Sequence, residues 1–292
     1  DDSSFVEGPY NLSFEKKFAT LQNCQEALLV ANGTDALEIA LLAHKIGPGD
    51  QVAVPGITFY ASAEAILNVG AVPVFVDVLP DSGLLDPASL KRVIEKFVIK
   101  AVMPVHIYGL PAPMKEIDLL CQEKSIPVIE DAAQAQGTIT HTGPVGSGPN
   151  LTTFSFYPTK NLSAFGDAGA ILTSDPELAE RIRAIRNHGR SPLEMLGRNS
   201  RCDHMQAAVL DLKLENVETL NLQRKKIACM YHEAFKKKGL TEINLLSDQF
   251  LETSSWHLYP IQLNSVEQRI KLGQQLAENQ IGFTPFYEKA LH

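Results

Sequence analysis

Short apolar runs alternate with longer amphipathic segments over the first two thirds of the chain. The runs are rich in valine and isoleucine, which is typical of buried strands, and the segments between them have helical periodicity. The expected strands are 26–30, 51–55, 71–78, 98–106, 126–131, 151–155 and 168–174, and the expected helices are 33–47, 59–70, 86–97, 114–124 and 175–189. This alternation predicts an α/β fold with a mostly parallel central sheet covered by helices on both faces.

The pattern changes after Cys202. Residues 202–238 are polar with leucines at helical spacing, and they predict one long helix that leaves the sheet. A strand at 256–263 and a helix at 266–278 follow, as in a smaller second domain. The expected division is therefore a large domain, 1–209, and a connecting helix with a small α/β domain, 210–292.

Composition narrows the class of protein. The chain has 292 residues, of which 45% are apolar and 21% charged, and its net charge of −8 offers no basic face for nucleic acid or an anionic membrane. The four cysteines lie far apart without a CxxC pair, so we expect reduced thiols and no metal. No apolar stretch reaches membrane-spanning length, and DDSSFVEGPY is not a secretory signal, so we expect a soluble cytoplasmic protein.

The first candidate for chemistry is the turn in ANGTDALEI, where a strand ends and a helix begins. The free backbone N–H groups and the dipole of such a helix start can bind an anion, here at Gly33, Thr34 and Asp35. The alternative is that Thr34 or Asp35 simply caps the helix.

The second candidate is the pair of carboxylates that ends the strand in VIEDAAQAQG. Glu130 and Asp131 are successive strand residues, so they point to opposite faces and cannot share one role. Ligands of α/β folds bind at the carboxyl ends of the strands, where an aspartate can pair with a protonated ring nitrogen. A cap for the following segment is the alternative.

The third candidate is Lys160, which lies among Phe156, Tyr157, Pro158 and Phe165 and follows Ser155 at a strand end. An apolar setting favours the neutral amine, which is nucleophilic toward carbonyls. We expect the aromatic residues and the proline to fix this amine and to keep bulk water away. The alternative is a lysine whose stem covers apolar surface.

The fourth candidate is Asn199 in GRNSRCDHMQAA, which is either part of a plain turn or of a polar loop that reaches across a subunit boundary. The order of the features is more informative than any one of them. An anion site, a strand-end aspartate and then a lysine are what pyridoxal 5'-phosphate requires.

With these motifs the sequence resembles the pyridoxal-phosphate sugar aminotransferases of the DegT/DnrJ/EryC1/StrS group, which have the fold-type-I aminotransferase architecture. The resemblance runs in order through nearly the whole chain. It rests on GPYNLSFEKKFA, GTDAL, PGITFYASAEAI, GAVPVFVDV, PVHIYG, IEDAAQAQG, SFYPTKNL, GDAGA, NSR and WHLYPIQL. It implies a large cofactor-binding domain and a smaller C-terminal α/β domain, which is expected to be incomplete here because family members continue past FYEKALH.

The resemblance also implies roles for individual residues. Lys160 forms the Schiff base with the cofactor and shuttles protons, while Asp131 pairs with the pyridine nitrogen. The other cofactor-binding residues implied are Gly33, Thr34, Asp35 and Ser155 for the phosphate, Phe59 stacked on the ring, Gln134 on the ring hydroxyl, and Asn199 from the neighbouring subunit of a homodimer.

The implied reaction moves the amino group of L-glutamate to a keto group of a nucleotide-linked sugar, in the biosynthesis of amino sugars, cell-surface polysaccharides or glycosides. Lysine rather than histidine at position 160 argues for transamination over dehydration. The residues of the GDAGA and SFYPTKNL motifs favour amination at carbon 3 of the sugar over carbon 4. A nicotinamide-dependent enzyme is excluded, because neither GPVGSG nor GDAGA has the G-x-G-x-x-G spacing. A non-catalytic or regulatory member of the same family is the remaining alternative.

Overall fold

The β-branched runs form the strands of one central sheet. The computed structural model describes residues 5–190, 196–240 and 243–292. The sheet strands are β1 (Glu26–Val30), β2 (Gln51–Pro55), β3 (Val72–Val76), β4 (Ile99–Val102), β5 (Ile129–Asp131), β8 (Leu151–Ser155) and β9 (Gly169–Thr173). A small hairpin of β6 (Ile139–Thr140) and β7 (Gly143–Pro144), which the sequence pattern did not predict, follows β5.

The strand order is that of a mostly parallel sheet with one reversed strand. Strands β3, β2 and β4 are parallel, and β5 is parallel to β8. Two parallel bridges, Val102–Val128 and Val105–Asp131, join these halves in the order β3-β2-β4-β5-β8-β9-β1. Only β9 runs antiparallel to its neighbours, because residues 156–168 return from β8 without a crossover helix.

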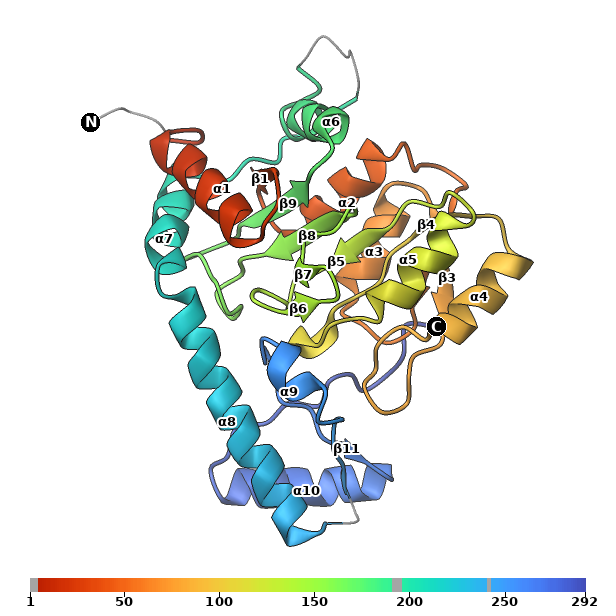
Figure 1. Cartoon of the computed structure of the whole chain (residues 1–292), viewed down its shortest axis with the longest axis vertical. Coiled ribbons are helices and arrows are strands. Elements are labelled where there is room, and N and C mark those ends of the chain that lie inside the picture. Colours follow the sequence, from red (N-terminus) through yellow and green to blue (C-terminus); the bar gives the residue numbers. More distant parts are fainter. Residues whose placement is uncertain (1–4, 191–195, 241–242) are drawn as a thin grey trace.

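Helices cover both faces of this sheet (Figure 1). They are α1 (Pro9–Leu21), α2 (Gly33–Ala43), α3 (Ala61–Asn68), α4 (Pro87–Lys96), α5 (Met114–Gln122), α6 (Pro176–Arg186) and α7 (His204–Leu214). Leu28 and Val30 of β1 pack in the core with α2, whereas Leu29 between them packs with Phe14 and Phe18 of α1. Both faces of the strand are therefore buried, which explains its continuous apolar sequence.

The single long helix predicted over 202–238 is wrong. The chain forms α7, a turn at Glu215 and Asn216, and then α8 (Val217–Lys238); Asn216 has φ −112° and ψ 0°, well away from the ideal values of a regular α-helix. Leu210, Leu214 and Val217 all belong to the core beneath α1, so α7 stays with the sheet and only α8 leaves it. The boundary expected between 209 and 210 falls inside α7, and the division into two domains stays a prediction.

The strand predicted over 256–263 is also largely wrong. Only β11 (Gln262–Leu263) pairs, with β10 (Ile243–Asn244), and the small unit is completed by α9 (Phe250–Thr253) and α10 (Val266–Glu278). Trp256 has φ +51°, and Pro260 has no N–H to donate to a strand. The N–H groups of Ser255 and Leu258 bind instead to the loop 108–109 of the large unit.

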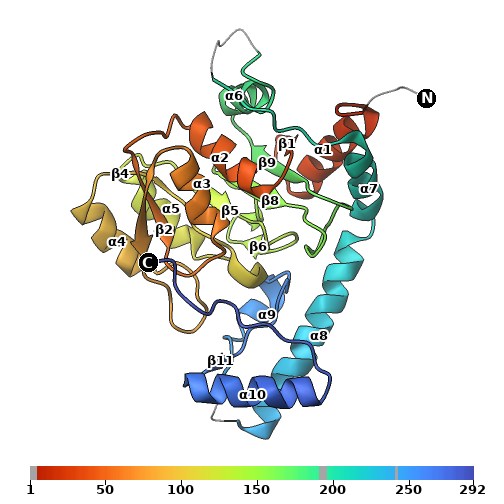
Figure 2. The ribbon, with the colours of Figure 1, turned by 180° about the vertical axis from the view of Figure 1, so that it is seen from behind.

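The segment after α10 runs back to the sheet, as Figure 2 shows. The N–H of Leu291 donates to the carbonyl of Gly56, just after β2, over 2.9 Å. This return brings the end of the chain to the same region as the carboxyl ends of the parallel strands. Within the described parts of the chain, every helix is too short or too polar to cross a bilayer.

Candidate active site

The predicted site residues lie along one edge of the sheet. Strands β1 and β8 are both antiparallel to β9, so they run parallel to each other and to β5. Their carboxyl ends therefore meet at one edge, where Asp131 ends β5, Ser155 ends β8 and the chain leaves β1 for Gly33. This is the edge at which α/β folds bind ligands.

The start of α2 lies against the end of β8. A Cβ built on Gly33 would be 2.7 Å from the Cβ of Ser155, so only glycine fits there without a shift. The cap of α2 is Asn32, whose side chain accepts from the N–H of Asp35 over 2.8 Å. Capping by Thr34 or Asp35, the alternative from the sequence, is thus wrong, because the preceding asparagine takes that role.

Capping by Asn32 leaves two backbone N–H groups at the start of α2 free to bind an anion. Among the described residues, the N–H groups of Gly33 and Thr34 have no hydrogen-bond acceptor, whereas that of Asp35 is committed to the cap. The hydroxyl of Ser155 lies beside them, and a helix N-terminus favours negative charge. The arrangement is a small cradle that suits a phosphate group.

Asp131 is a buried carboxylate, 5% exposed, held by two donors. Its Oδ2 accepts from the hydroxyl of Ser62 on α3 over 2.8 Å, and its Oδ1 accepts from the N–H of Ala133 over 3.1 Å. Ser62 is in turn 3.0 Å from the hydroxyl of Thr58. These contacts fix the carboxylate at the sheet edge, and the sequence analysis did not identify Ser62 or Thr58.

Glu130 points away from Asp131, as the alternation of strand residues predicts. Its Oε2 is 2.9 Å from Nε2 of the fully buried His106, and its Oε1 accepts from Asn150. Nδ1 of His106 accepts from the N–H of Ala112, so Nε2 carries the proton that is donated to Glu130. This pair lies on the face of β5 opposite to Asp131 and is separate from the Asp131 carboxylate.

Lys160 lies on the return from β8 to β9. Burial lowers the pKa of its amine, and the nearby charge of Asp131 opposes that shift. Among the described residues, its Nζ has neither a hydrogen bond nor an ion pair. The structure thus brings together a partly buried, unpaired amine and the strand-end carboxylate.

The aromatic residues around Lys160 do not form the shield that the sequence predicted. Phe156 is fully buried, but it packs in the core against Phe14 and Phe18. Tyr157 is 51% exposed and Phe165 76% exposed. The alternation of the strand explains this difference, because the residue that follows Ser155 points to the opposite side of β8.

Gln134 follows Asp131 by one turn and is buried. Its Oε1 accepts from the N–H of Tyr108 over 2.6 Å, and its Nε2 donates to the hydroxyl of Tyr287 over 3.3 Å. Tyr108 has φ +62°, a left-handed conformation that directs its N–H at this amide. The Tyr287 hydroxyl also lies near Asp131, and burial raises the pKa of Tyr287 to about 12.

Phe59 and Asn199 are more exposed than the other predicted residues. The ring of Phe59, just before α3, is 45% exposed and lies 4.1 Å from the ring of Tyr60, centroid to centroid. Asn199 is exposed on the loop before α7, where its Oδ1 accepts from the guanidinium of Arg201.

His257 is the further residue near Lys160 that sequence reasoning left out. Its Nδ1 is 3.2 Å from Oδ1 of Asn161, the residue that follows the lysine. Burial, together with the charges of Lys160 and Arg224, lowers the pKa of His257 to about 3. The segment WHLYPIQL was predicted to be a strand, and that prediction gave no indication that His257 lies beside Asn161.

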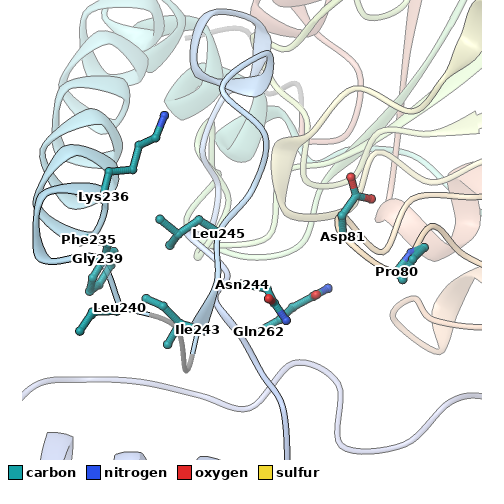
Figure 3. Close-up of a pocket in the computed structure, with 10 residues that line it drawn as sticks. All are labelled: Pro80, Asp81, Phe235, Lys236, Gly239, Leu240, Ile243, Asn244, Leu245 and Gln262. Atoms are coloured by element: carbon teal, nitrogen blue, oxygen red, sulfur yellow. The ribbon is translucent and has the colours of Figure 1, made fainter.

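A groove lies between the small unit and the large unit, and its volume is about 580 Å³. It is bounded by the end of α8, the strands β10 and β11, and the turn at Pro80 and Asp81, as Figure 3 shows. Its lining also includes Phe235, Lys236, Gly239, Leu240, Ile243, Asn244, Leu245 and Gln262. It shares no residue with the site around Lys160 and is a separate feature.

The residues at the sheet edge fit pyridoxal phosphate. The cradle of Gly33, Thr34 and Ser155 suits the phosphate, the buried Asp131 suits a protonated ring nitrogen, and the free amine of Lys160 suits the aldehyde. The described residues contain no cluster of three histidine, cysteine, aspartate or glutamate side chains that would hold a metal ion. All four cysteines are free thiols.

Solved structures with this architecture are aminotransferases. The structure of S. venezuelae DesV in complex with a ketimine intermediate matches with a TM-score of 0.93 and 37% identity, over 100% of this chain and 78% of that one. Other similar structures hold the cofactor in its pyridoxal or pyridoxamine form. The fold and the site thus define a fold-type-I, pyridoxal-phosphate-dependent aminotransferase.

The relatives give the family. The dTDP-3-amino-3,4,6-trideoxy-alpha-D-glucose transaminase of Streptomyces venezuelae is 38% identical over 100% of this chain and 76% of its own length. The UDP-N-acetyl-3-dehydro-alpha-D-glucosamine 3-aminotransferase of Acidithiobacillus ferrooxidans is 44% identical over 80% of this chain and 64% of its own length. The model of the DegT/DnrJ/EryC1/StrS aminotransferase family matches residues 1–292, and the chain belongs to this family. The predicted fold class, enzyme class and cofactor are confirmed.

Proposed function

We propose that this chain moves the amino group of L-glutamate to the C3 keto group of a nucleotide-linked deoxysugar. The names of both relatives place the amino or keto group at carbon 3 of a dTDP- or UDP-linked sugar, which supports this substrate class. The reaction has two halves. When bound, the cofactor would carry the amino group between the two substrates, so that glutamate would depart as 2-oxoglutarate and the keto-sugar would receive the amine.

The observation that supports the proposal is that the unpaired amine of Lys160 and the buried carboxylate of Asp131 lie at the same edge of the sheet. The amine has a lowered pKa because of burial, so it is uncharged at a lower pH than an ordinary lysine. The carboxylate beside it is buried and fixed by Ser62. An uncharged amine and a fixed carboxylate are what the two ends of the pyridoxal ring need.

When bound, pyridoxal phosphate supplies an electron sink that stabilises negative charge on the amine-bearing carbon. In our proposal Lys160 would hold the cofactor and, once freed, would carry a proton on its Nζ to or from that carbon. Asp131 would hold the ring nitrogen in its protonated form, and the N–H of Ala133 and the hydroxyl of Ser62 hold the Asp131 carboxylate in place.

The phosphate would be held by Gly33, Thr34 and Ser155. Asp35 belongs to the same helix start, but its N–H is already bound to Asn32, so its contribution is to the shape of the cradle. The cradle lies at the N-terminus of α2, where the helix dipole favours a phosphate.

The remaining proposed contacts are those of Gln134, Phe59 and Asn199. Gln134 would contact the ring hydroxyl in exchange for its bond to Tyr287, and Phe59 would stack on the ring face. The exposed Asn199 would reach the phosphate of a neighbouring subunit, which makes the proposed unit a homodimer with shared sites. We also propose that the protein acts in the cytoplasm and meets its nucleotide-linked sugar substrates there.

The test is a visible absorbance spectrum of the full chain with pyridoxal phosphate, before and after L-glutamate. The lysine-bound cofactor should give a yellow band that glutamate bleaches. Addition of a dTDP- or UDP-linked 3-keto sugar should restore the band and yield an amino sugar with the expected mass. A band that glutamate leaves unchanged would contradict the proposal and support the non-catalytic alternative.

A substitution at the cradle gives a prediction about cofactor binding. In Gly33→Ala the new methyl group meets the Cβ of Ser155 at 2.7 Å, so the start of α2 must move away from β8. Such overpacking costs about 1–3 kcal/mol, and we expect the Kd for pyridoxal phosphate to rise at least about tenfold, as about 1.4 kcal/mol would give. Fluorescence titration of the cofactor measures this change.

The matched control is Gly47→Ala. Gly47 lies beyond the other end of the same helix, α2, and nothing lies within 4 Å of a Cβ built on it. We expect its cofactor affinity to equal that of the wild type. Equal affinities for both variants would show that the cradle does not hold the phosphate.

A further inference from the structure

The residue after Lys160 anchors the return from β8 to β9. This residue, Asn161, is 8% exposed. Its Nδ2 donates to Oδ1 of Asn221 on α8 and to the carbonyl of Ser255 after α9, both over 2.9 Å. Both hydrogens of the amide are thus committed, and they tie the chain beside the lysine to two segments that lie outside the sheet.

Asn221 connects this anchor to the segment that follows β5. Its Nδ2 donates to the carbonyl of Gln136 over 2.8 Å. A Cβ built on Gly137 would collide with that Nδ2, and Gly137 also has φ +95°. Glycine at this position therefore lets α8 approach the backbone closely.

Gln136 extends these contacts to the end of β8. It is 1% exposed, and its Nε2 donates to the carbonyl of Ser155 over 2.6 Å. Gln136 also closes the short segment that begins with Asp131 and includes Gln134, the two proposed partners of the cofactor ring. Three side-chain amides therefore link the phosphate cradle, the segment of the ring partners and the residue after Lys160.

Backbone carbonyls fix the orientation of each amide in this network. Ser155, Gln136 and Ser255 each present a carbonyl, which only accepts, so an NH₂ group must face it. Asn221 then turns its Oδ1 toward Asn161, where it accepts from the same Nδ2 that binds the carbonyl after α9. Buried polar networks whose members find such partners make a site rigid.

Other contacts hold the return farther along the chain. Lys213 on α7 donates to the carbonyl and the hydroxyl of Ser163 over 2.8 and 3.1 Å. Gln206 on the same helix accepts from the N–H of Phe165 over 2.8 Å. Among the described residues, the side-chain contacts that lie nearest to Lys160 along the return are thus those of its neighbouring asparagine.

We propose that Asn161 and Asn221 are positioning residues for Lys160. Their paired amides set where the backbone of the lysine lies relative to the segment that carries the ring partners. This inference rests on the proposed function and adds to it. The amine must meet an aldehyde that the rest of the site holds in place, and a misplacement of about 1 Å can cost on the order of 10²-fold in rate.

Two forms of the cofactor separate this role from a merely structural one. Pyridoxal phosphate bonds to the lysine through its aldehyde, whereas pyridoxamine phosphate carries an amine there and depends on the phosphate and ring contacts alone. In Asn161→Ala and in Asn221→Ala we expect the Kd for pyridoxal phosphate to rise about tenfold and that for pyridoxamine phosphate to stay within about twofold, as the loss of one buried hydrogen bond beside the lysine would give. Fluorescence titration of the cofactor-free full chain measures both constants.

Turnover and the double variant give two further readouts. With saturating cofactor, kcat should fall about tenfold while the KM for glutamate stays unchanged, because the lysine and not the substrate is displaced. The variant with both substitutions, Asn161→Ala and Asn221→Ala, should lose little more than the weaker single variant, because the two amides act as one unit. Asn221 is only half-buried, so Asn221→Ala decides the question if Asn161→Ala does not fold.

The matched control is Asn150→Ala. Asn150 is also a bridging amide, and its Nδ2 donates to Asp118 over 3.0 Å and to Glu130 over 2.9 Å. These contacts lie on the face of β5 opposite to Asp131. We expect Asn150→Ala to lower Tm and to leave both Kd values as in the wild type.

Two results would overturn the inference. Equal rises in both Kd values would mean that the amides support the whole site and not the lysine, and an unchanged Kd for pyridoxal phosphate in both single variants would mean that the lysine keeps its position without them. If the wild type forms a yellow band that glutamate bleaches, the proposed function stands in either case. A wild type that forms no band overturns both.

Discussion

Lys160→Ala is expected to abolish the yellow band of the lysine-bound cofactor and to reduce transamination at least about 10⁴-fold, since both the covalent link and the proton transfer are lost. The amine has no hydrogen bond or ion pair among the described residues, so its removal breaks no contact of the fold. Tm should stay within a few degrees of the wild-type value. Absorbance and a coupled assay for 2-oxoglutarate measure the two losses.

The control for this variant is Lys124→Ala. Lys124 is an exposed lysine after α5, and its substitution should leave the band and the rate unchanged. A Lys160→Ala protein that still forms the band, and still transfers amine at more than about a hundredth of the wild-type rate, would assign the chemistry to another lysine.

Asp131→Asn is expected to reduce turnover about 10²–10³-fold while the protein stays folded, because an amide cannot hold a proton on the ring nitrogen as a carboxylate does. The buried contacts survive the exchange. The Asn oxygen can accept from the N–H of Ala133, and the hydroxyl of Ser62 can rotate to accept from the amide and donate to Thr58. Rapid-scan absorbance with glutamate measures the slower half-reaction.

The neighbouring carboxylate provides the matched control. Glu130 accepts from both His106 and Asn150, so Glu130→Gln leaves one of these buried donors facing an NH₂ group, at a cost of about 1–3 kcal/mol. We expect this variant to lose stability and to keep most of its turnover per folded molecule. The opposite pattern, with turnover lost at Glu130 and retained at Asp131, would reverse the assignment of the two carboxylates.

Much of the fold could be predicted from local sequence patterns. The strands and helices of the large unit follow from the spacing of apolar residues, and the ends of β5 and β8 follow from the polar residues after each run. Parallel strands place their carboxyl ends on one edge, so the position of Asp131 and Ser155 on the same edge of the sheet could also be foreseen. These features depend on residues that are close together in the sequence, so they can be read from the sequence directly.

Predictions that depended on distant contacts were less successful. The break at Asn216 arises because α7 packs under α1 while α8 must leave the sheet. The expected strand at 256–263 was lost because Ser255 and Leu258 bind to loop 108–109, which holds Trp256 in a left-handed conformation. The periodicity of a segment carries no information on such partners.

The sequence by itself determined the class of this protein. The order of a helix start for anions, a strand-end carboxylate and a lysine indicates the cofactor, whose chemistry demands those residue types, and the resemblance of the motifs to a known family indicates the reaction. The tertiary structure decided which atoms are free to act. It assigns the cap to Asn32, which leaves the N–H groups of Gly33 and Thr34 for a ligand. It also brings His257 to Asn161, because hydrogen-bond donors and acceptors find partners by distance in space and not by position in the chain.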